Sequence, residues 1–429
     1  MTKRQVRIKN LFRNLILINA IFRRKKEIEH NLHGGIIMKL LHTADWHIGR
    51  TLNGYSLLDE QKAAFQQILN IALEEHVDGI VIAGDIYDRA IPNVDAVTTL
   101  NKMFKEINID HHLPIYAISG NHDGAKRLNY GRDWMEYNNF HLNTLVSEAF
   151  EPIETPKVQI FMLPFFDPMD VRAYYHQQGV LEEDTKKIHS IVDAMNLVLT
   201  DMQKNFDPNK KHLLITHFAV TPNKEDKIEL TSETTSTVGG LATLTADQFQ
   251  MFDYVMLGHI HTRFASPSET IRYSGSPVKF NVKEARIKNK GKGVDIVEID
   301  NDKITHTFKK IKPQTDLIVL EEEWNTLTDP TFYKQQPIDS AWFAITVKNF
   351  DRSKHINVRA QLQEIYGTVV ELDYENVYQD KQDQAVQNIS ELSPDETVDQ
   401  FFHSITGNDL SKTQKHIVDK IFVDLRKEK

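Results

Sequence analysis

The sequence predicts a layered α/β protein that continues into a smaller α+β domain and C-terminal helices. Short apolar runs rich in Ile and Val recur along the first two thirds of the chain, and such runs are typical of strands buried on both faces. Two intervening stretches, residues 59–75 and 94–107, have apolar residues at helical spacing, so strands and helices alternate as in sheets covered by helices. The expected strands lie at residues 39–41, 78–83, 114–118, 212–215 and 254–257.

The composition is that of an ordinary globular protein with a net negative charge. The 429 residues include 51 Lys and Arg against 60 Asp and Glu, which gives a formal charge of −9. Such a chain has no general basic surface for nucleic acid, so any contact with DNA has to be local. The absence of Cys excludes disulfides, thiolate zinc sites, iron–sulfur clusters and Cys nucleophiles, whereas the 19 His favour metal sites of imidazole and carboxylate groups.

Residues 1–37 differ from the rest of the chain in their charge. Residues 1–30 contain nine Lys and Arg against two Glu, and the apolar run at 11–22 is too short and too polar for a membrane span. Two interpretations remain open. The segment is either a basic amphipathic arm that touches a membrane or nucleic acid, or an extension that is not translated, with Met38 as the natural start.

Polar residues that suit a binding site follow each of the expected strands. In α/β layers, residues just beyond the carboxyl ends of strands converge on one crevice. Taken singly these groups are weak signals, since an Asp after a strand often caps the next helix, but five of them in this order indicate one site. The groups are Asp45-x-His47, Gly84-Asp85-x-x-Asp88, Gly120-Asn121-His122-Asp123, Thr216-His217 and Gly258-His259-x-His261.

The donor atoms in these groups predict two metal ions. Carboxylate, imidazole and one amide carbonyl suit borderline divalent ions such as manganese, iron or zinc, and they exclude a sulfur site or an all-oxygen calcium site. So many ligands suit two ions about 3.5–4 Å apart that share a carboxylate, an arrangement that assists phosphoryl displacement. The candidate ligands are Asp45, His47, Asp85, Asn121, His217, His259 and His261.

In this order and spacing, the five groups resemble the calcineurin-like metallophosphoesterase superfamily. Residues 41–49, 84–92 and 273–277 are more narrowly similar to the DNA nucleases of that superfamily that work with a coiled-coil ATPase. The resemblance covers residues 38–280 well and implies an α/β/β/α sandwich. The candidate ligands match the family pattern throughout, and the basic N-terminal segment is the one feature that the family does not lead us to expect.

The resemblance also implies a role for each residue of the predicted site. The implied ligands are Asp45, His47, Asp85 and His261 for one Mn²⁺ ion, and Asp85, Asn121, His217 and His259 for the other. His122 would serve the leaving oxygen, as an acid or as a hydrogen-bond donor to the charged transition state. Asp88 and Asp123 would orient the imidazole ligands and the loops, with a plain helix cap as the alternative for Asp88.

The same resemblance implies a manganese-dependent exo- and endonuclease subunit that processes DNA ends and hairpins in DNA repair, recombination and replication. The implied partners are a coiled-coil ATPase, double- and single-stranded DNA and a second copy of this chain, in a cytoplasmic heterotetramer without membrane contact. The five groups do not themselves identify the substrate, so a phosphoesterase acting on nucleotides or phosphoproteins is the alternative. A metal-bound scaffold that mainly recruits the ATPase is a further one.

We expect a nuclease domain at residues 38–277, a capping domain at 278–378, a polar linker at 379–392 and a helical segment at 393–429. By resemblance, the capping domain helps to select DNA. The helical segment has two short amphipathic stretches, which either dock the ATPase or pack on the chain's own core.

Two segments near the predicted site have two interpretations each. Residues 221–240 are rich in Thr and Ser and form either a surface loop that orders on substrate binding or a solvated spacer. Residues 279–292 carry six basic side chains, which form either a patch for the phosphate backbone or a solvated charged face. These side chains are Lys279, Lys283, Arg286, Lys288, Lys290 and Lys292.

Overall fold

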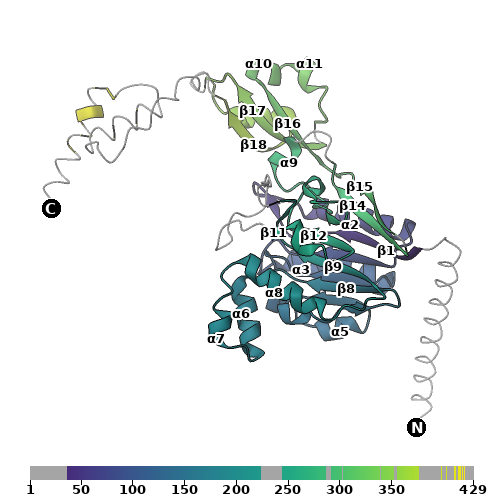
Figure 1. Cartoon of the computed structure of the whole chain (residues 1–429). Helices are drawn as coiled ribbons and strands as arrows, with labels where there is room; N and C mark the ends of the chain where they lie inside the picture. Colours follow the sequence, from purple (N-terminus) through teal and green to yellow (C-terminus); the bar gives the residue numbers. More distant parts are fainter. Residues whose placement is uncertain are drawn as a thin grey trace, which may run out of the picture. The chain divides into compact units, whose positions relative to one another are not determined.

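A sandwich of two β-sheets forms the first of two compact units. The computed structural model describes residues 36–223, 244–286, 291–301, 303–338, 340–351 and 355–375, together with isolated positions between 398 and 420 (Figure 1). Among these residues, the first unit extends to Ile318 and includes 340–342, and the second begins at Val319. The expected N-terminal extension, most of the 221–240 loop, the linker and nearly all of the C-terminal helical segment lie outside the described residues.

The first sheet has the strand order β15-β14-β1-β4-β5-β6. Strands β1, β4, β5 and β6 run parallel, while β14 and β15 add an antiparallel edge. β4 is buried at every position, as its continuous apolar sequence predicts. The strands are β1 (Ile36–Thr43), β4 (Gly79–Ala83), β5 (Ile115–Ile118), β6 (Phe140–Asn143), β14 (Gly293–Asp300) and β15 (Ile304–Lys310).

The second sheet has the strand order β13-β12-β9-β8-β7. Its strands are parallel except for the short edge strand β7. Both sheets therefore direct the carboxyl ends of parallel strands into loops, where polar side chains can gather. The strands are β7 (Ile153–Glu154), β8 (Val158–Leu163), β9 (Lys211–His217), β12 (Tyr254–Gly258) and β13 (Ile271–Tyr273).

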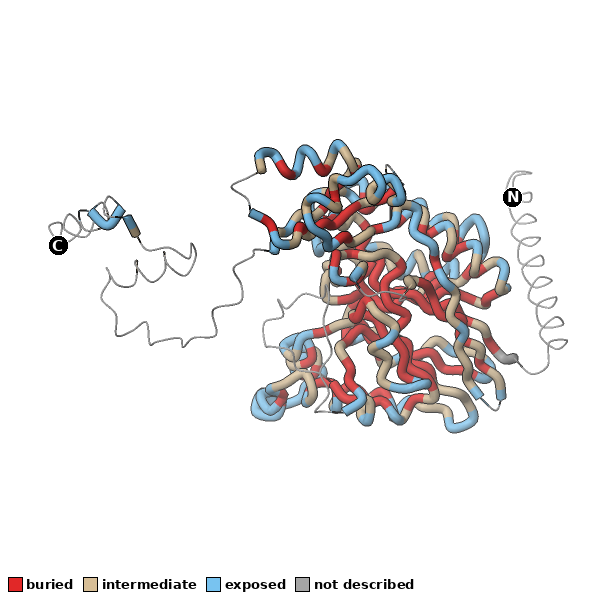
Figure 2. Tube along the Cα trace, turned by 90° about the horizontal axis from the view of Figure 1, so that it is seen from above, coloured by how far each residue is buried: buried red, intermediate tan, exposed pale blue. Residues whose placement is uncertain are grey.

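Three apolar clusters form the core and define four layers. One lies between the sheets, with Leu40 of β1 and Ile215 of β9 among its members. A second joins the outer face of the first sheet to α2 (Leu58–Glu74) and α3 (Val94–Phe104), and the third joins the second sheet to α6 (Pro168–Gln177) and α8 (Ile191–Gln203). Buried residues concentrate in these strands (Figure 2). The predicted α/β/β/α sandwich, its five strands and its two helices are confirmed.

Strands β14 and β15 differ from the expected domain boundary at residue 277. The sequence assigned their apolar runs to the capping domain, but β14 pairs antiparallel with β1 from Ile36 to His42. Along β14, Val294 and Ile296 enter one core cluster, while Val297 and Ile299 enter the cluster between the sheets. The first unit therefore extends about 40 residues further, to Ile318, because a strand buried on both faces completes the first sheet.

The second unit contains most of a three-stranded sheet with the order β16-β17-β18. Its strands are β16 (Asp316–Glu323), β17 (Ala341–Lys348) and β18 (Thr368–Tyr374), and α12 (Val358–Tyr366) lies between the last two in the chain. This mixture of strands and helix agrees with an α+β unit. Within the described part of the chain, no helix combines the length and apolar character that crossing a membrane requires.

Candidate metal centre

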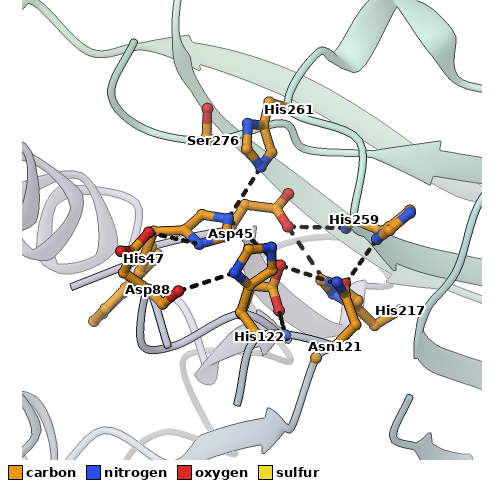
Figure 3. A network of polar contacts seen from close by, with 12 residues as sticks. Asp45, His47, Asp88, Asn121, His122, His217, His259, His261 and Ser276 are labelled. Carbon is orange, nitrogen blue, oxygen red and sulfur yellow. Dashed lines mark hydrogen bonds and ion pairs between the residues drawn. The ribbon is translucent and has the colours of Figure 1, made fainter. Parts of the chain in front are cut away.

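Loops from both sheets bring all the predicted ligands together (Figure 3). Asp45 and His47 follow β1, Asp85 follows β4, and Asn121 follows β5. From the second sheet, His217 ends β9 while His259 and His261 follow β12. We call Asp45, His47 and His261 the Asp45 cluster, and Asn121, His217 and His259 the Asn121 cluster.

The backbone of these loops is strained at four of the predicted ligands. Asp45, His47, Asp85 and His259 have φ values of 54°, 44°, 51° and 94°. Residues with a side chain rarely adopt this left-handed conformation, and it persists only where the surrounding structure enforces it. Here the β1 and β4 loops hold each other, because the amide of Asp45 donates to Gly84 O at 3.1 Å and that of His47 to Asp85 O at 2.9 Å.

The Asp45 cluster fits a cation. Its three residues offer ligand atoms that lie within 4.8 Å of one another, and Nε2 of His47 is 3.0 Å from Nε2 of His261. Asp45 is fully buried, yet its Oδ2 accepts no hydrogen bond from any described residue. A buried carboxylate oxygen without a partner is costly, and a metal ion would remove that cost.

In the Asn121 cluster, two imidazole rings face one amide oxygen. Asn121 Oδ1 is 2.9 Å from His259 Nδ1 and 3.2 Å from His217 Nε2. The other ring nitrogen of His217, Nδ1, lies 2.7 Å from Ala83 O, the last residue of β4. Since a carbonyl oxygen only accepts, Nδ1 carries a proton, and Nε2 is the ring nitrogen left to bind an ion.

Asp85 lies between the two clusters. Its Oδ2 is 3.4 Å from His47 Nε2 and 3.3 Å from His217 Nε2, while its Oδ1 accepts the backbone N–H of His122 at 2.9 Å. One carboxylate oxygen therefore faces an imidazole group of each cluster. The backbone N–H of His259 adds a second link between the clusters by donating to Asp45 Oδ1 at 2.9 Å.

Burial and neighbouring charges separate the pKa values of these groups in the metal-free protein. Burial raises the pKa of Asp45 to about 6. Burial also acts to raise the pKa of Asp85, but the charges of His217 and His47 outweigh it and hold that pKa well below its usual range. Burial alone would lower the pKa of His217, yet Asp85 and Asp45 raise it to about 9. Burial lowers the pKa of His47.

His122 is half-buried at the edge of the two clusters. Its ring is 4.7 Å from that of His47, and its Nδ1 is 2.9 Å from Asp88 O. The Asp88 carboxylate pairs with Arg50 and Arg89, each at 3.3 Å, and lies 3.9 Å from His47 Nδ1. Asp88 therefore contacts His122 through its backbone oxygen and Arg50 through its carboxylate.

Asp123 joins two of the loops. Its carboxylate accepts the backbone N–H groups of Ile86 at 3.1 Å, Tyr87 at 2.9 Å and Gly120 at 2.9 Å. Burial raises its pKa to about 6. These bonds hold the loop after β4 against the loop after β5.

Sequence reasoning missed Gln61 of α2. Its amide nitrogen donates to Trp46 O at 3.0 Å and to His47 O at 2.7 Å, and its Oε1 accepts from Gly49 N at 3.0 Å. The sequence did contain a signal for Gln61. This residue precedes Ala64 by about one helical turn and so occupies the apolar face of the helix. A buried polar side chain on such a face needs partners.

Sequence reasoning also missed the pairing of Glu284 with Lys292. Lys292 was expected in a basic surface patch, but it is largely buried against Glu284. Burial alone would raise the pKa of Glu284, yet Lys292 and His261 lower it to about 2, so the carboxylate stays charged. Lys279 pairs with Asp316 at 2.7 Å, and Lys288 and Lys290 lie outside the described residues.

Comparisons with known proteins agree with this fold. Residues 38–263 match the family described as calcineurin-like phosphoesterase, and residues 313–406 match the family described as type 5 capsule protein repressor C-terminal domain. The first match includes all of the predicted ligands. A solved structure, TT1561 of Thermus thermophilus, aligns at 11% identity with a TM-score of 0.34, covering 63% of this chain and 98% of its own; a likeness this low carries no argument.

Two curated relatives align with about nine tenths of this chain. The protein named as the D subunit of nuclease SbcCD in Staphylococcus epidermidis is 33% identical over 388 residues, covering 89% of this chain and 98% of its own. The protein of the same name from Staphylococcus saprophyticus is 31% identical over 398 residues, covering 91% and 99%. The chain therefore belongs to the calcineurin-like phosphoesterases and, within them, to the family of SbcCD nuclease D subunits. The resemblance inferred from the motifs is confirmed.

Proposed function

We propose that this protein is a two-metal DNA phosphodiesterase, the nuclease subunit of a complex like SbcCD. The position of Asp85 Oδ2 carries the proposal, because it lies 3.4 Å from His47 Nε2 and 3.3 Å from His217 Nε2. A carboxylate oxygen between two imidazole groups is what a ligand shared by two ions requires. The mixture of oxygen and nitrogen donors supports Mn²⁺ as the ion.

In this proposal, each cluster holds one ion and Asp85 belongs to both sites. The ligands are Asp45, His47, Asp85 and His261 for one ion, and Asp85, Asn121, His217 and His259 for the other. Two divalent ions would supply positive charge opposite the phosphate and a water of lowered pKa.

The protein's own side chains would position the reacting groups. His122 donates from Nδ1 to Asp88 O, so Nε2 is the ring nitrogen that would exchange a proton with the leaving oxygen or donate to the charged transition state. Asp123 would keep the loops after β4 and β5 in register through its three backbone hydrogen bonds. Asp88, held by Arg50, would fix the carbonyl that orients His122.

The relatives' names support a macromolecular substrate and a partner. Both are named as the D subunit of the nuclease SbcCD. We therefore assign to this chain double- and single-stranded DNA as substrate, an SbcC-like coiled-coil ATPase as partner, and a homodimer within a heterotetramer. The roles are exo- and endonuclease cleavage in DNA repair, recombination and replication, in the cytoplasm. The names weigh against nucleotides or phosphoproteins as the substrate.

Within the chain, residues 38–318 would form the nuclease domain and the second unit the capping domain. Residues 379–392 would link it to the ATPase-docking helices at 393–429. The match of residues 313–406 to a C-terminal domain family supports a separate region after the nuclease domain.

Digestion of linear DNA by the purified chain tests the proposal. We expect degradation with Mn²⁺, none after chelation, and stimulation by the ATPase partner with ATP. Intact DNA at saturating Mn²⁺, with or without the ATPase, would refute the nuclease assignment, especially if nucleotides or a phosphopeptide were hydrolysed instead.

Deletion of residues 393–429 tests the docking segment. We expect loss of the ATPase complex in gel filtration, with Mn²⁺-dependent cleavage of a simple phosphodiester retained. An undiminished complex would show that other parts of the chain bind the ATPase.

A further inference from the structure

A buried pair of opposite charges lies directly behind His261. The side chains of Glu284, in α9 (Val282–Arg286), and Lys292, just before β14, are only 6% and 14% exposed and form an ion pair. The Lys292 ammonium also donates to Ser276 Oγ at 2.7 Å and to the backbone oxygen of His261 at 2.8 Å. Lys292 therefore links the Glu284 side chain, the His261 backbone and Ser276.

Glu284 lies beside the edge of the His261 ring that points away from the metal centre. Its Oε1 is 3.7 Å from His261 Nδ1. The opposite ring nitrogen, Nε2, is 3.0 Å from His47 Nε2. The ring thus lies between the Glu284 carboxylate on one side and His47 of the same cluster on the other.

The Glu284 carboxylate is itself held in place. Its Oε1 accepts from the backbone N–H of Phe280 at 3.3 Å and from Asn281 Nδ2 at 3.2 Å. Asn281 Oδ1 in turn accepts the backbone N–H of Glu284 at 2.9 Å. The Phe280 ring packs edge-on against the rings of His47 and His261, at 5.1 Å and 5.4 Å. The short segment 280–284 therefore fixes both the acid and the imidazole rings.

Stability alone gives no reason for a charged pair at this position. Burying two charges costs several kcal/mol of desolvation, which their attraction often fails to recover. His217 obtains its orientation from the neutral carbonyl of Ala83 at 2.7 Å, without a buried charge. A carboxylate behind a metal-binding imidazole fixes the ring and strengthens it as a ligand, which a carbonyl does less well.

We propose that Glu284 is a positioning residue for His261, held by Lys292, which turns Nε2 of His261 toward the Asp45 cluster and strengthens the binding of the ion there. The inference rests on the proposed two-metal site and adds two residues to it. It also implies that the segment between β13 and β14 supports the ion of the Asp45 cluster, whereas the strand backbone supports the ion of the Asn121 cluster.

Titration of the metal-free full-length protein with Mn²⁺ tests the inference. For Glu284→Gln, we expect one of the two ions to bind roughly 10- to 100-fold more weakly, as for other residues behind metal ligands, and the other ion to bind as in wild type. Lys292→Met should weaken the same ion. That ion is identified by His261→Asn, which should affect the same step of the titration.

Matched controls come from the partly exposed ion pair of Glu154 and Lys210. Glu154→Gln and Lys210→Met remove the same kinds of charge and should leave both affinities unchanged. Unfolding temperatures measured in chelator separate positioning from general stability. An unfolding temperature that falls while both ions weaken equally would overturn the inference, and so would unchanged affinities in Glu284→Gln.

Two outcomes distinguish this inference from the proposed function. Wild-type protein that binds two ions but leaves DNA intact would refute the nuclease assignment, and a selective loss of affinity in Glu284→Gln would still support positioning. If Glu284→Gln fails to fold, the double variant Glu284→Gln/Lys292→Met leaves no lone buried charge, and its titration decides in the same way.

Discussion

The two clusters of the candidate metal centre are held in place by different means. In the Asn121 cluster, His217 belongs to β9 itself, and its ring is fixed by the backbone carbonyl of Ala83 on the neighbouring sheet. In the Asp45 cluster, His47 and His261 follow their strands in loops and are fixed by side chains, Gln61 for the first and Glu284 for the second.

This difference predicts how each cluster responds to mutation. A backbone carbonyl at a strand end cannot be removed by a substitution, so few residues outside the ligands should affect the ion of the Asn121 cluster. Added bulk is the exception, since a Cβ on Gly84 or Gly258 would lie 2.3 Å or 2.6 Å from His217 Nδ1. The supports of the Asp45 cluster are side chains and can be removed singly, so its ion can be weakened alone.

The largest effect is expected where the two clusters meet, at Asp85. Asp85→Asn should disturb both ions and reduce DNA cleavage roughly 10⁴-fold, because several kcal/mol of transition-state stabilisation by the metals would be lost. Metal content after gel filtration and the cleavage rate measure this. Asp95→Asn, which changes an exposed carboxylate on α3, is the control. Full Mn²⁺-dependent activity in Asp85→Asn would disprove the shared ligand.

A smaller effect that leaves both clusters intact is expected at His122. His122→Gln should slow cleavage about 10³-fold, within the range for a lost acid or donor, while two ions remain bound. Metal content and single-turnover cleavage at saturating Mn²⁺ test this. His111→Gln, which changes an exposed His in the segment before β5, should behave as wild type. An unchanged rate in His122→Gln would remove this residue from the mechanism.

The contrast between the clusters is sharpened by Gln61. Gln61→Leu removes the hydrogen bonds to Trp46, His47 and Gly49, so we expect the ion of the Asp45 cluster to bind roughly 10-fold more weakly. The other ion should be unaffected. Gln66→Leu, on the exposed face of the same helix, is the matched control in the Mn²⁺ titration. Equal weakening of both ions would remove the distinction between the clusters.

The smallest effect is a difference in pH dependence. Ion binding to the Asn121 cluster must displace the proton of His217, whose pKa is raised to about 9, so its affinity should fall about tenfold per pH unit below that value. Protons compete at Asp45 only below its pKa of about 6. As the pH is lowered from about 9 to about 6, Mn²⁺ titrations should show that the affinity of the Asn121 cluster falls steeply. The affinity of the Asp45 cluster should fall less over the same range. Parallel slopes would contradict the pKa assignment.

The sequence predicted the ligands because each follows a local pattern that can be read without the fold. Asp45, Asp85 and Asn121 come shortly after apolar runs that are typical of buried strands. Neither Gln61 nor Glu284 follows such a run. Gln61 is marked only by its place on the apolar face of α2, and a Glu in a short helix such as α9 is usually solvated. The same limit explains β14, whose apolar run was recognised as a strand but placed in the wrong domain.

By itself, the sequence determined alternating strands and helices and the polar groups that follow the strands, and through those motifs the family and the α/β/β/α layers that the family implies. The alternation and the motifs depend on periodicity and on residue order, which are properties of neighbouring residues. Only the tertiary structure decided that Asp85 faces both clusters, that β14 completes the first sheet, and that Glu284 lies behind His261. Those contacts join segments far apart in the chain, and their geometry is set by how the two sheets pack, which no local pattern encodes.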